Sequence, residues 1–264
     1  MKKTVLKGKP LARLKERRLK ELAIHRLIPN ILTLTALCAG LNGIRFALMD
    51  KWEFAVIAIF VAIIFDTMDG RVARYLDAST RFGGELDSLS DFVSFGVAPA
   101  IILYLHTLQN FGRIGWGIAL LFAICCALRL ARFNTLDIEG TEKLPAQFFR
   151  GVPVPAGAVL ALLPLIMTLE PEVKYWVPSV AMGISTVVGA LLMISQIPTF
   201  SLKSRRIKQK HVLPLLLLVV FFVGALVTIP WVTLSIMGIV YLITIPFSVR
   251  AYKRYYETTT YHSE

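Results

Sequence analysis

Two pairs of aspartates border apolar runs in this sequence. Asp66 and Asp69 follow the apolar run 54–65, and Asp87 and Asp91 directly precede another. Residues three or four apart lie on one face of a helix, so two antiparallel helices would direct all four carboxylates into one space. Carboxylates this close repel one another unless hard cations neutralise them, and oxygen ligands favour Mg²⁺ or Mn²⁺. The spacing therefore predicts a divalent metal site, with two ions for phosphoryl-group chemistry.

The residues beside the aspartates suit a nucleotide diphosphate. Gly70 and Ala73 keep one helix face open to a flat group, and Arg74 lies one turn beyond Gly70, within reach of a phosphate. Gly83 lets the connection turn tightly before the next helix. Structural alternatives stay open here, because an aspartate at a helix end can be a cap and Arg74 can pair with a neighbouring carboxylate.

The segment 66–91 resembles the signature of the CDP-alcohol phosphotransferase family, D-x2-D-G-x2-A-R-x8-G-x3-D-x3-D. All eight fixed positions are present: Asp66, Asp69, Gly70, Ala73, Arg74, Gly83, Asp87 and Asp91. The resemblance implies a helical membrane enzyme that moves a phosphatidyl or similar group from a CDP-activated donor to an alcohol and releases CMP. It also implies that the first three aspartates bind one metal ion, that the first, third and fourth contact a second, and that Asp91 is the general base.

Other segments point to one branch of this family. The segments 90–100 (SDFVSFGVAPA), 129–134 (RLARFN) and 149–158 (FRGVPVPAGA) resemble the phosphatidylserine synthase branch, and 29–33 (PNILT) resembles the opening of the family's first span. The branch implies CDP-diacylglycerol and L-serine as substrates, with phosphatidylserine and CMP as products. The family resemblance is also compatible with a homodimer.

Two classes of alternative function stay open. The same chemistry could use another acceptor alcohol, namely choline, glycerol phosphate or inositol phosphate. A more distant alternative is an ion-coupled transporter that uses the aspartates as an ion site. Transporters typically hold buried charges near the membrane midplane and contain paired repeats, whereas this acidic cluster lies at the ends of its apolar runs and the sequence has no internal repeat.

Polar residues outside the signature are candidates for substrate contacts. Arg129 and Arg132 are three apart and share a helix face with Asn134 nearby, so they could hold the serine carboxylate or the donor phosphate by forked hydrogen bonds. The alternative is that both arginines are topology residues that face lipid headgroups. Asn30 and Thr33 are also three apart and could touch the nucleotide, although Asn30 is equally suited to cap the first helix.

The composition requires a membrane for these elements. Of the 264 residues, 56% are hydrophobic and 17% charged, against roughly 25% charged in typical soluble domains. The mean hydropathy is +0.65. These values exclude a soluble globular domain, a disordered chain and a coiled coil. Cys38, Cys125 and Cys126 all lie in apolar runs, which predicts burial in helices rather than a disulfide or a metal site.

Uncharged runs predict an all-α protein with about eight transmembrane helices. The longest run, 212–249, exceeds one crossing, and Pro230 divides it into two spans. With eight spans and a cytosolic N-terminus, 25 of the 29 Lys and Arg residues fall on the cytosolic side. This distribution predicts a multi-pass protein of the cytoplasmic (inner) membrane, with both termini and the active site facing the cytosol. The transmembrane domain is predicted at 27–250 and a cytosolic tail at 251–264.

The segment 1–26 carries ten basic and two acidic residues. Leu11, Leu14, Leu19 and Leu22 fall on one helical arc, which predicts a short amphipathic juxtamembrane helix on anionic membrane lipids. A basic tail that only sets topology is the alternative. Nucleic-acid binding is not expected, because the charge directly adjoins a membrane span.

Overall fold

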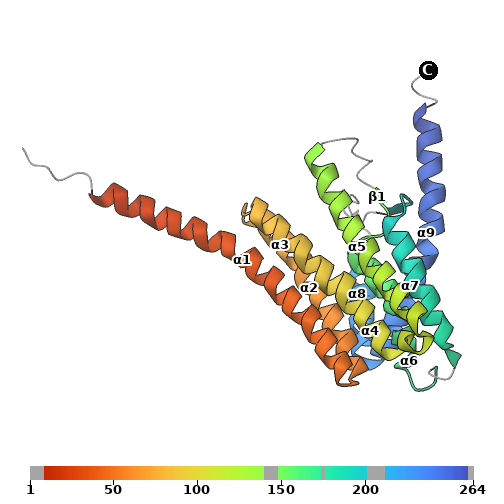
Figure 1. Cartoon of the computed structure of the whole chain (residues 1–264). Coiled ribbons are helices and arrows are strands. Elements are labelled where there is room, and N and C mark those ends of the chain that lie inside the picture. The colour runs from red at the N-terminus through yellow and green to blue at the C-terminus, as the bar shows by residue number, and fades with distance from the viewer. Residues whose placement is uncertain (1–8, 140–147, 174–175, 201–211, 261–264) are drawn as a thin grey trace, which may run out of the picture.

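The computed structural model describes residues 9–139, 148–173, 176–200 and 212–260 (Figure 1). This part of the chain is almost entirely helical, as predicted. The α-helices are α1 (Lys9–Leu48), α2 (Trp52–Tyr75), α3 (Arg81–Asp91), α4 (Ala98–His106), α5 (Arg113–Glu139), α6 (Val154–Thr168), α7 (Ser179–Ile194), α8 (Val212–Thr228) and α9 (Pro230–Thr260). A π-helical turn η1 (Phe92–Val97) joins α3 to α4, and a 3-10 turn η2 (Leu108–Phe111) joins α4 to α5.

The helices form a bundle in which α1 and α2 pack along one another and the α3–η1–α4 segment packs across α1 and α5. Its apolar core is formed by fully buried side chains that include Ile59, Phe95, Ile102, Phe122 and Leu165. The start of α1, the α2–α3 connection and the end of α9 lie toward the same end of the bundle (Figure 1). This arrangement gathers the aspartate-bearing ends of α2 and α3 at that end.

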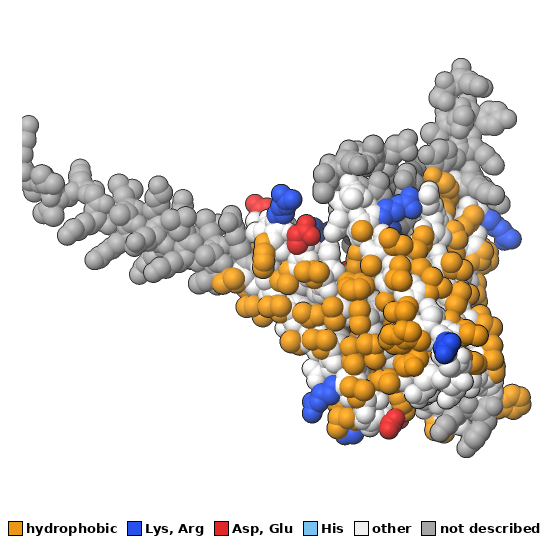
Figure 2. Space-filling view, in the orientation of Figure 1, with side chains coloured by type: hydrophobic (Ala, Val, Ile, Leu, Met, Phe, Trp, Pro, Cys, Tyr) orange, Lys and Arg blue, Asp and Glu red, His pale blue; other side chains and the backbone are white. Residues whose placement is uncertain are grey.

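Four stretches of the described chain are long and apolar enough to cross a membrane, namely Leu27–Leu48, Arg81–His106, Arg113–Thr135 and Pro230–Tyr252. Shorter apolar helices cover Val154–Thr168, Ser179–Ile194 and Leu213–Thr228. Figure 2 shows apolar side chains over the middle of one face and charged side chains mainly toward its two ends. The chain therefore has the surface of a membrane protein, while the count of eight spans and the side on which the termini lie stay predictions.

The first helix differs from the prediction in one respect. A juxtamembrane helix was expected to precede a separate span beginning at residue 27, but α1 is one continuous helix of 40 residues with Pro29 inside it. Asn30 therefore lies within the helix, and the alternative that it caps the first span is wrong. The side chains of the basic segment lie outside the described residues, so its binding to anionic lipid stays a prediction.

Prolines mark two helix starts, and the one at Pro230 was predicted. The helix α8 ends at Thr228 and α9 begins at Pro230. Pro153 directly precedes α6, where its missing N–H costs little. The cysteine prediction is confirmed in part: all three are free and lie in helices, and Cys125 and Cys126 are buried, but Cys38 is exposed on α1.

Two short strands were not expected from the sequence. β1 (Phe148–Arg150) pairs antiparallel with β2 (Pro198–Phe200), with Phe149 opposite Thr199. The Thr199 hydroxyl donates to the Gly151 carbonyl at 2.9 Å, and the Ser248 hydroxyl of α9 donates to the Pro198 carbonyl at 2.8 Å. These contacts fix the entry to α6 and the exit from α7 against α9.

Candidate active site

The α2–α3 connection is a local structure that the sequence specifies closely. Asp77 has a left-handed backbone conformation (φ 51°), and the Ala78 amide donates to the Ala73 carbonyl at 2.8 Å, a helix-terminating pattern known as the Schellman motif. Thr80 then caps α3, because its hydroxyl oxygen accepts from the Gly83 amide at 3.0 Å. The chain thus reverses within five residues, and α2 and α3 both pack on α1.

The reversal brings the predicted aspartates together. Carboxylate oxygens of Asp66, Asp69 and Asp87 all lie within 4.8 Å of one another. The Asp91 carboxyl group interacts with that of Asp66. Asp69 is only 4% exposed. Three of the four predicted aspartates, from two helices, therefore share one space. That these residues bind metal stays a prediction.

This donor set fits a divalent cation. Hard divalent cations such as Mg²⁺ and Ca²⁺ bind oxygen ligands at about 2.0–2.6 Å. Two ligands on opposite sides of one ion are therefore roughly 4–5 Å apart. The carboxylate oxygens of the cluster, which all lie within 4.8 Å of one another, satisfy this spacing. The carboxyl groups of Asp66 and Asp91 interact with each other. Two carboxylates this close repel unless they share a proton or a cation lies between them. The residues present therefore suit a metal ion by both distance and charge.

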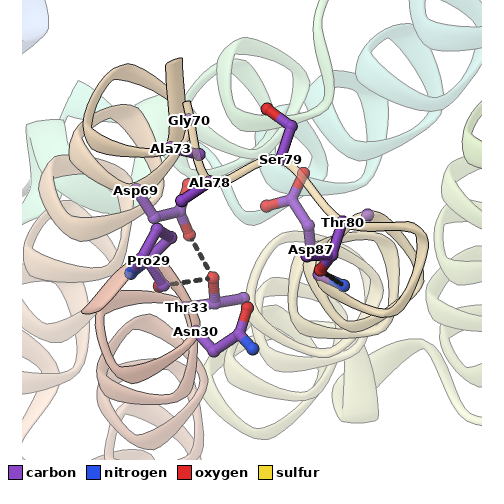
Figure 3. Close-up of a pocket in the computed structure, with 12 residues that line it drawn as sticks. Pro29, Asn30, Thr33, Asp69, Gly70, Ala73, Ala78, Ser79, Thr80 and Asp87 are labelled. Atoms are coloured by element: carbon purple, nitrogen blue, oxygen red, sulfur yellow. Dashed lines mark hydrogen bonds between the residues drawn. The ribbon is translucent and has the colours of Figure 1, made fainter. Parts of the chain in front are cut away.

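Thr33 of α1 supports this cluster. Its hydroxyl donates to the Asp69 Oδ2 at 2.6 Å and also contacts the Pro29 carbonyl at 3.1 Å (Figure 3). Thr33 is 3% exposed. The sequence predicted that Thr33 touches the nucleotide; the structure shows in addition that its hydroxyl holds an aspartate of the cluster.

A pocket of about 180 Å³ opens beside the aspartates between α1, α2 and α3 (Figure 3). Its lining consists of Pro29, Asn30, Thr33, Asp69, Gly70, Ala73, Ala78, Ser79, Thr80, Gly83, Gly84 and Asp87. A Cβ on Gly70 would meet nothing within 4 Å, whereas a Cβ on Gly83 would lie 3.1 Å from both Asn30 Oδ1 and Thr80 Oγ1. The first glycine keeps a face open and the second permits close packing of α3 against α1.

Arg74 lies outside the lining of this pocket. Its side chain is exposed, and its Nε donates to the Gly70 carbonyl on the same helix at 2.9 Å. The five other predicted donor-binding residues, Asn30, Thr33, Gly70, Ala73 and Gly83, all line the pocket. The structure therefore groups all but one of the donor-site residues, with Arg74 one turn beyond the rim.

The predicted acceptor residues do not line the pocket, and Arg129 and Asn134 interact with different neighbouring helices. Arg129 is partly buried and interacts electrostatically with Arg132 and with Tyr241 of α9. The Asn134 Nδ2 donates to the Ser88 hydroxyl on α3 at 3.0 Å. Arg129 thus faces α9 while Asn134 joins α5 to the helix that carries Asp87.

Sequence similarity places this site in a known family. The sequence profile described as CDP-alcohol phosphatidyltransferase matches residues 26–195, which include the four aspartates and the whole pocket lining. The chain belongs to the CDP-alcohol phosphatidyltransferase family. A second profile, described as CDP-alcohol phosphatidyltransferase 2, matches residues 210–246.

Several members of this family resemble the chain over most of its length. A Mycobacterium tuberculosis (strain H37Rv) protein named CDP-diacylglycerol–serine O-phosphatidyltransferase is 37% identical over 227 residues, covering 86% of this chain and 79% of the relative. A Helicobacter pylori (strain J99) protein of the same name is 36% identical over 224 residues, covering 82% and 88%. Another of that name from Methanocaldococcus jannaschii is 42% identical over 136 residues, covering 50% and 60%.

This CDP-alcohol phosphatidyltransferase has site residues that were not expected from the sequence. Ala78, Ser79 and Thr80 also line the pocket. Thr80 carried a usable signal, since a threonine just before a helix is a common N-cap. Ser88 carried none, because its contact with Asn134 joins residues 46 positions apart.

Proposed function

We propose that this CDP-alcohol phosphatidyltransferase transfers the phosphatidyl group of CDP-diacylglycerol to the hydroxyl of L-serine, giving phosphatidylserine and CMP. The observation that carries the proposal is the cluster of Asp66, Asp69 and Asp87, with Asp91 interacting with Asp66, beside a pocket formed by α1, α2 and α3. Relatives that cover most of this chain bear the name CDP-diacylglycerol–serine O-phosphatidyltransferase, which supports serine as the acceptor.

The aspartates would hold two ions of Mg²⁺ or Mn²⁺. Asp66, Asp69 and Asp87, whose oxygens cluster within 4.8 Å, would hold the first ion, and Asp66, Asp87 and Asp91 the second. Bound ions of this kind neutralise a diphosphate and stabilise the leaving oxygen. The Thr33 hydroxyl keeps the Asp69 carboxylate oriented toward the cluster through its 2.6 Å hydrogen bond.

Asp91 would be the general base. Its carboxylate accepts the proton of the serine hydroxyl, and the serine oxygen forms a bond to the phosphorus that bears diacylglycerol. The bond from that phosphorus to the bridging oxygen breaks, and CMP departs with the bond electrons. Asn30, Gly70, Ala73 and Gly83, which line the pocket or its open face, would bind the CDP group.

Charged groups beyond the pocket would bind the remaining parts of both substrates. Arg74, exposed one turn past Gly70, would swing toward the diphosphate and assist the transfer. Arg129, Arg132 and Asn134 would bind the serine carboxylate or the donor phosphate, because an arginine fork matches the two oxygens of either group.

The enzyme would work at the cytosolic side of the inner membrane. Eight spans place both termini and the acidic cluster on the side that holds most Lys and Arg residues. Residues 1–26 would bind anionic lipid headgroups, residues 27–250 would form the transmembrane domain, and residues 251–264 a cytosolic tail. The start of α1 and the end of α9 lie toward the end of the bundle that carries the aspartates (Figure 1), which supports this arrangement.

The test is a comparison of acceptors with the purified full chain. Protein in liposomes receives CDP-diacylglycerol with Mn²⁺ or Mg²⁺ and one of L-serine, choline, glycerol phosphate or inositol phosphate, and CMP and the lipid product are measured. Of the four acceptors, we expect only L-serine to give CMP release and a lipid product, phosphatidylserine. EDTA, which removes the metal ions, should abolish CMP release and phosphatidylserine formation. Turnover with another acceptor in place of serine would refute the serine assignment.

A further inference from the structure

A π-helical turn directly follows the aspartate assigned as the base. Asp91 is the last residue of α3, and η1 covers the next six residues, Phe92–Val97. The Ala98 amide donates to the carbonyl of Val93, five residues earlier, whereas an α-helix would use the residue four earlier. Such a turn holds an extra residue, is rare, and frequently occurs at functional sites. Because α3 and α4 continue on either side, the turn determines how α3 is rotated relative to α4.

One side of this turn is fastened to α1. The Ser90 hydroxyl donates to the Thr33 carbonyl at 3.1 Å, and the Ser94 hydroxyl, one turn later, donates to the Ala36 carbonyl at 3.3 Å. Ser94 is fully buried. A Cβ on Gly40 of α1 would lie 2.6 Å from the Ser94 Oγ and 2.7 Å from its Cα. The two backbones thus approach closely enough that only glycine fits at position 40.

The other side of the turn is fastened to α5. A Cβ on Gly96 would lie 2.8 Å from the Sγ of Cys126 and 3.0 Å from its Cβ. Gly96 and Cys126 are both buried. Ser94 and Gly96 are two positions apart and therefore point to nearly opposite sides of a helix. The turn is consequently held between α1 and α5 with no room for displacement toward either helix.

The same contacts reach the acidic cluster. Thr33 accepts from Ser90 through its carbonyl and donates to Asp69 through its hydroxyl, so one residue of α1 contacts both aspartate-bearing helices. Asp91 follows Ser90 in sequence and contacts the Asp66 carboxyl group. A shift or rotation of the π turn would therefore move Asp91 relative to Asp66 while the pocket residues of α1 and α2 stay in place.

We propose that the π-helical turn, fixed by Ser94 against α1 and by Gly96 against α5, sets the position of the Asp91 carboxylate in the metal cluster. Ser94 and Gly96 are then positioning residues that act through Asp91. The proposal rests on the proposed function of the aspartates as metal ligands, and it deepens that function by naming the element that holds the fourth carboxylate.

The test uses Gly96→Ala in the full-length protein. Its new methyl group collides with Cys126 and displaces the turn, so we expect the dissociation constant for Mn²⁺ to rise at least fivefold, measured by electron paramagnetic resonance without substrates. In the CMP-release assay, kcat should fall at least tenfold while the KM for CDP-diacylglycerol changes less than threefold. The double variant Gly96→Ala/Cys126→Gly removes the collision and should restore Mn²⁺ affinity to within threefold of the wild type.

A matched control separates positioning from loss of stability. Gly157→Ala on α6 would place its Cβ 2.6 Å from the Cγ and 2.7 Å from the Sδ of Met193, an equally close contact with a sulfur-containing side chain outside the pocket. It should lower the unfolding temperature but leave Mn²⁺ affinity and kcat within twofold. Ser94→Ala introduces no collision and should raise the Mn²⁺ dissociation constant two- to fivefold even if Gly96→Ala does not fold.

Two results would overturn the proposal. One is unchanged Mn²⁺ affinity in both Gly96→Ala and Ser94→Ala, and the other is a loss of affinity in Gly96→Ala that the Cys126→Gly change does not restore. The proposed transfer reaction fails separately: a wild-type protein that binds Mn²⁺ but releases no CMP with serine would refute that reaction, while the comparison of Mn²⁺ affinities would still decide the role of the turn.

Discussion

Residue spacing predicted two groups of site residues, the acidic cluster and the α5 group formed by Arg129, Arg132 and Asn134. The structure brings the first group together but not the second. Three aspartates from two helices place oxygens within 4.8 Å of one another, and the fourth contacts the first. The α5 group separates: Arg129 faces Tyr241 of α9, and the Asn134 amide donates to Ser88 of α3. One group is assembled without substrate, and the other is distributed between two neighbouring helices.

The difference follows from how each group is positioned. The aspartates lie on two consecutive helices whose reversal is fixed by a Schellman motif and a threonine cap, and both helices pack on α1. Arg129, Arg132 and Asn134 lie on one helix, and their surroundings come from α3 and α9, which are distant in the sequence. The cluster therefore suits a fixed task such as metal binding, and the α5 group suits contacts completed by a substrate.

The largest expected effect comes from Asp91→Asn. This change keeps the shape of the side chain but removes the charge and the proton acceptor, and loss of a general base alone costs about 10²- to 10⁴-fold in rate. We expect serine-dependent CMP release to fall by about 10³-fold or more while the protein still accumulates in the membrane. Release is measured with saturating CDP-diacylglycerol and Mn²⁺.

Asp77→Asn is the matched control for this variant. Asp77 lies in the α2–α3 connection, outside the pocket lining, with a left-handed backbone that asparagine tolerates. It removes one negative charge close to the site and should leave turnover within about twofold. If Asp91→Asn kept substantial turnover, another residue would have to accept the serine proton.

The helical membrane character of the chain and the grouping of Asp66, Asp69 and Asp87 could be predicted, because both depend on local residue patterns. The break at Pro230 and the pairing of the aspartates are examples. Contacts between distant residues could not be predicted from spacing. Thr33 and Asp69 are 36 positions apart and Ser88 and Asn134 are 46 apart.

The π-helical turn after Asp91 shows a second limit. Its sequence, FVSFGV, has the same apolar character as the α-helical residues that follow, so periodicity alone predicts one continuous helix. The turn is stabilised by its neighbours, through Ser94 on α1 and Gly96 on α5. A single sequence therefore predicts the helix but not the extra residue in its path.

Arg129→Ala tests whether the distributed group binds serine. Hydrogen bonds to a charged partner contribute about 1.5–3 kcal/mol, so loss of the forked contact should raise the KM for serine about 10- to 100-fold with a smaller change in kcat. Arg129→Lys keeps the charge but loses the fork and should recover only part of the affinity. Initial rates over a range of serine concentrations provide the measurement.

Arg113→Ala, at the opposite end of the same helix, is the control and should not change either KM. A rise confined to the KM for CDP-diacylglycerol would assign Arg129 to the donor phosphate instead of serine. Unchanged values for both substrates would favour the topology alternative, in which the α5 arginines only orient the chain. A role of the α5 group is thus measured as a change in the KM of a substrate, whereas a role of the acidic cluster is measured as a change in metal dependence.

The smallest effect is expected at the support of the cluster. Thr33→Val keeps the volume of the side chain but removes the hydroxyl that donates to Asp69 at 2.6 Å. A hydrogen bond to a charged group contributes about 1.5–3 kcal/mol. Because this bond orients a ligand and does not itself bind the metal, we expect only part of that free energy to appear in metal affinity, roughly a threefold to tenfold change. We expect both the Mn²⁺ dissociation constant and the Mn²⁺ concentration for half-maximal turnover to rise by about that factor.

Thr35→Val provides a close control for this last variant. Thr35 lies two positions further along α1, and its hydroxyl donates to the Ile31 carbonyl of its own helix at 2.8 Å. Because this bond stays within α1, its loss should change Mn²⁺ affinity less than twofold. Equal effects of the two variants would mean that the Thr33 hydroxyl acts only on helix stability. A larger effect of Thr33→Val would show that the acidic cluster needs the Thr33 hydroxyl of α1 to hold Asp69 for the metal.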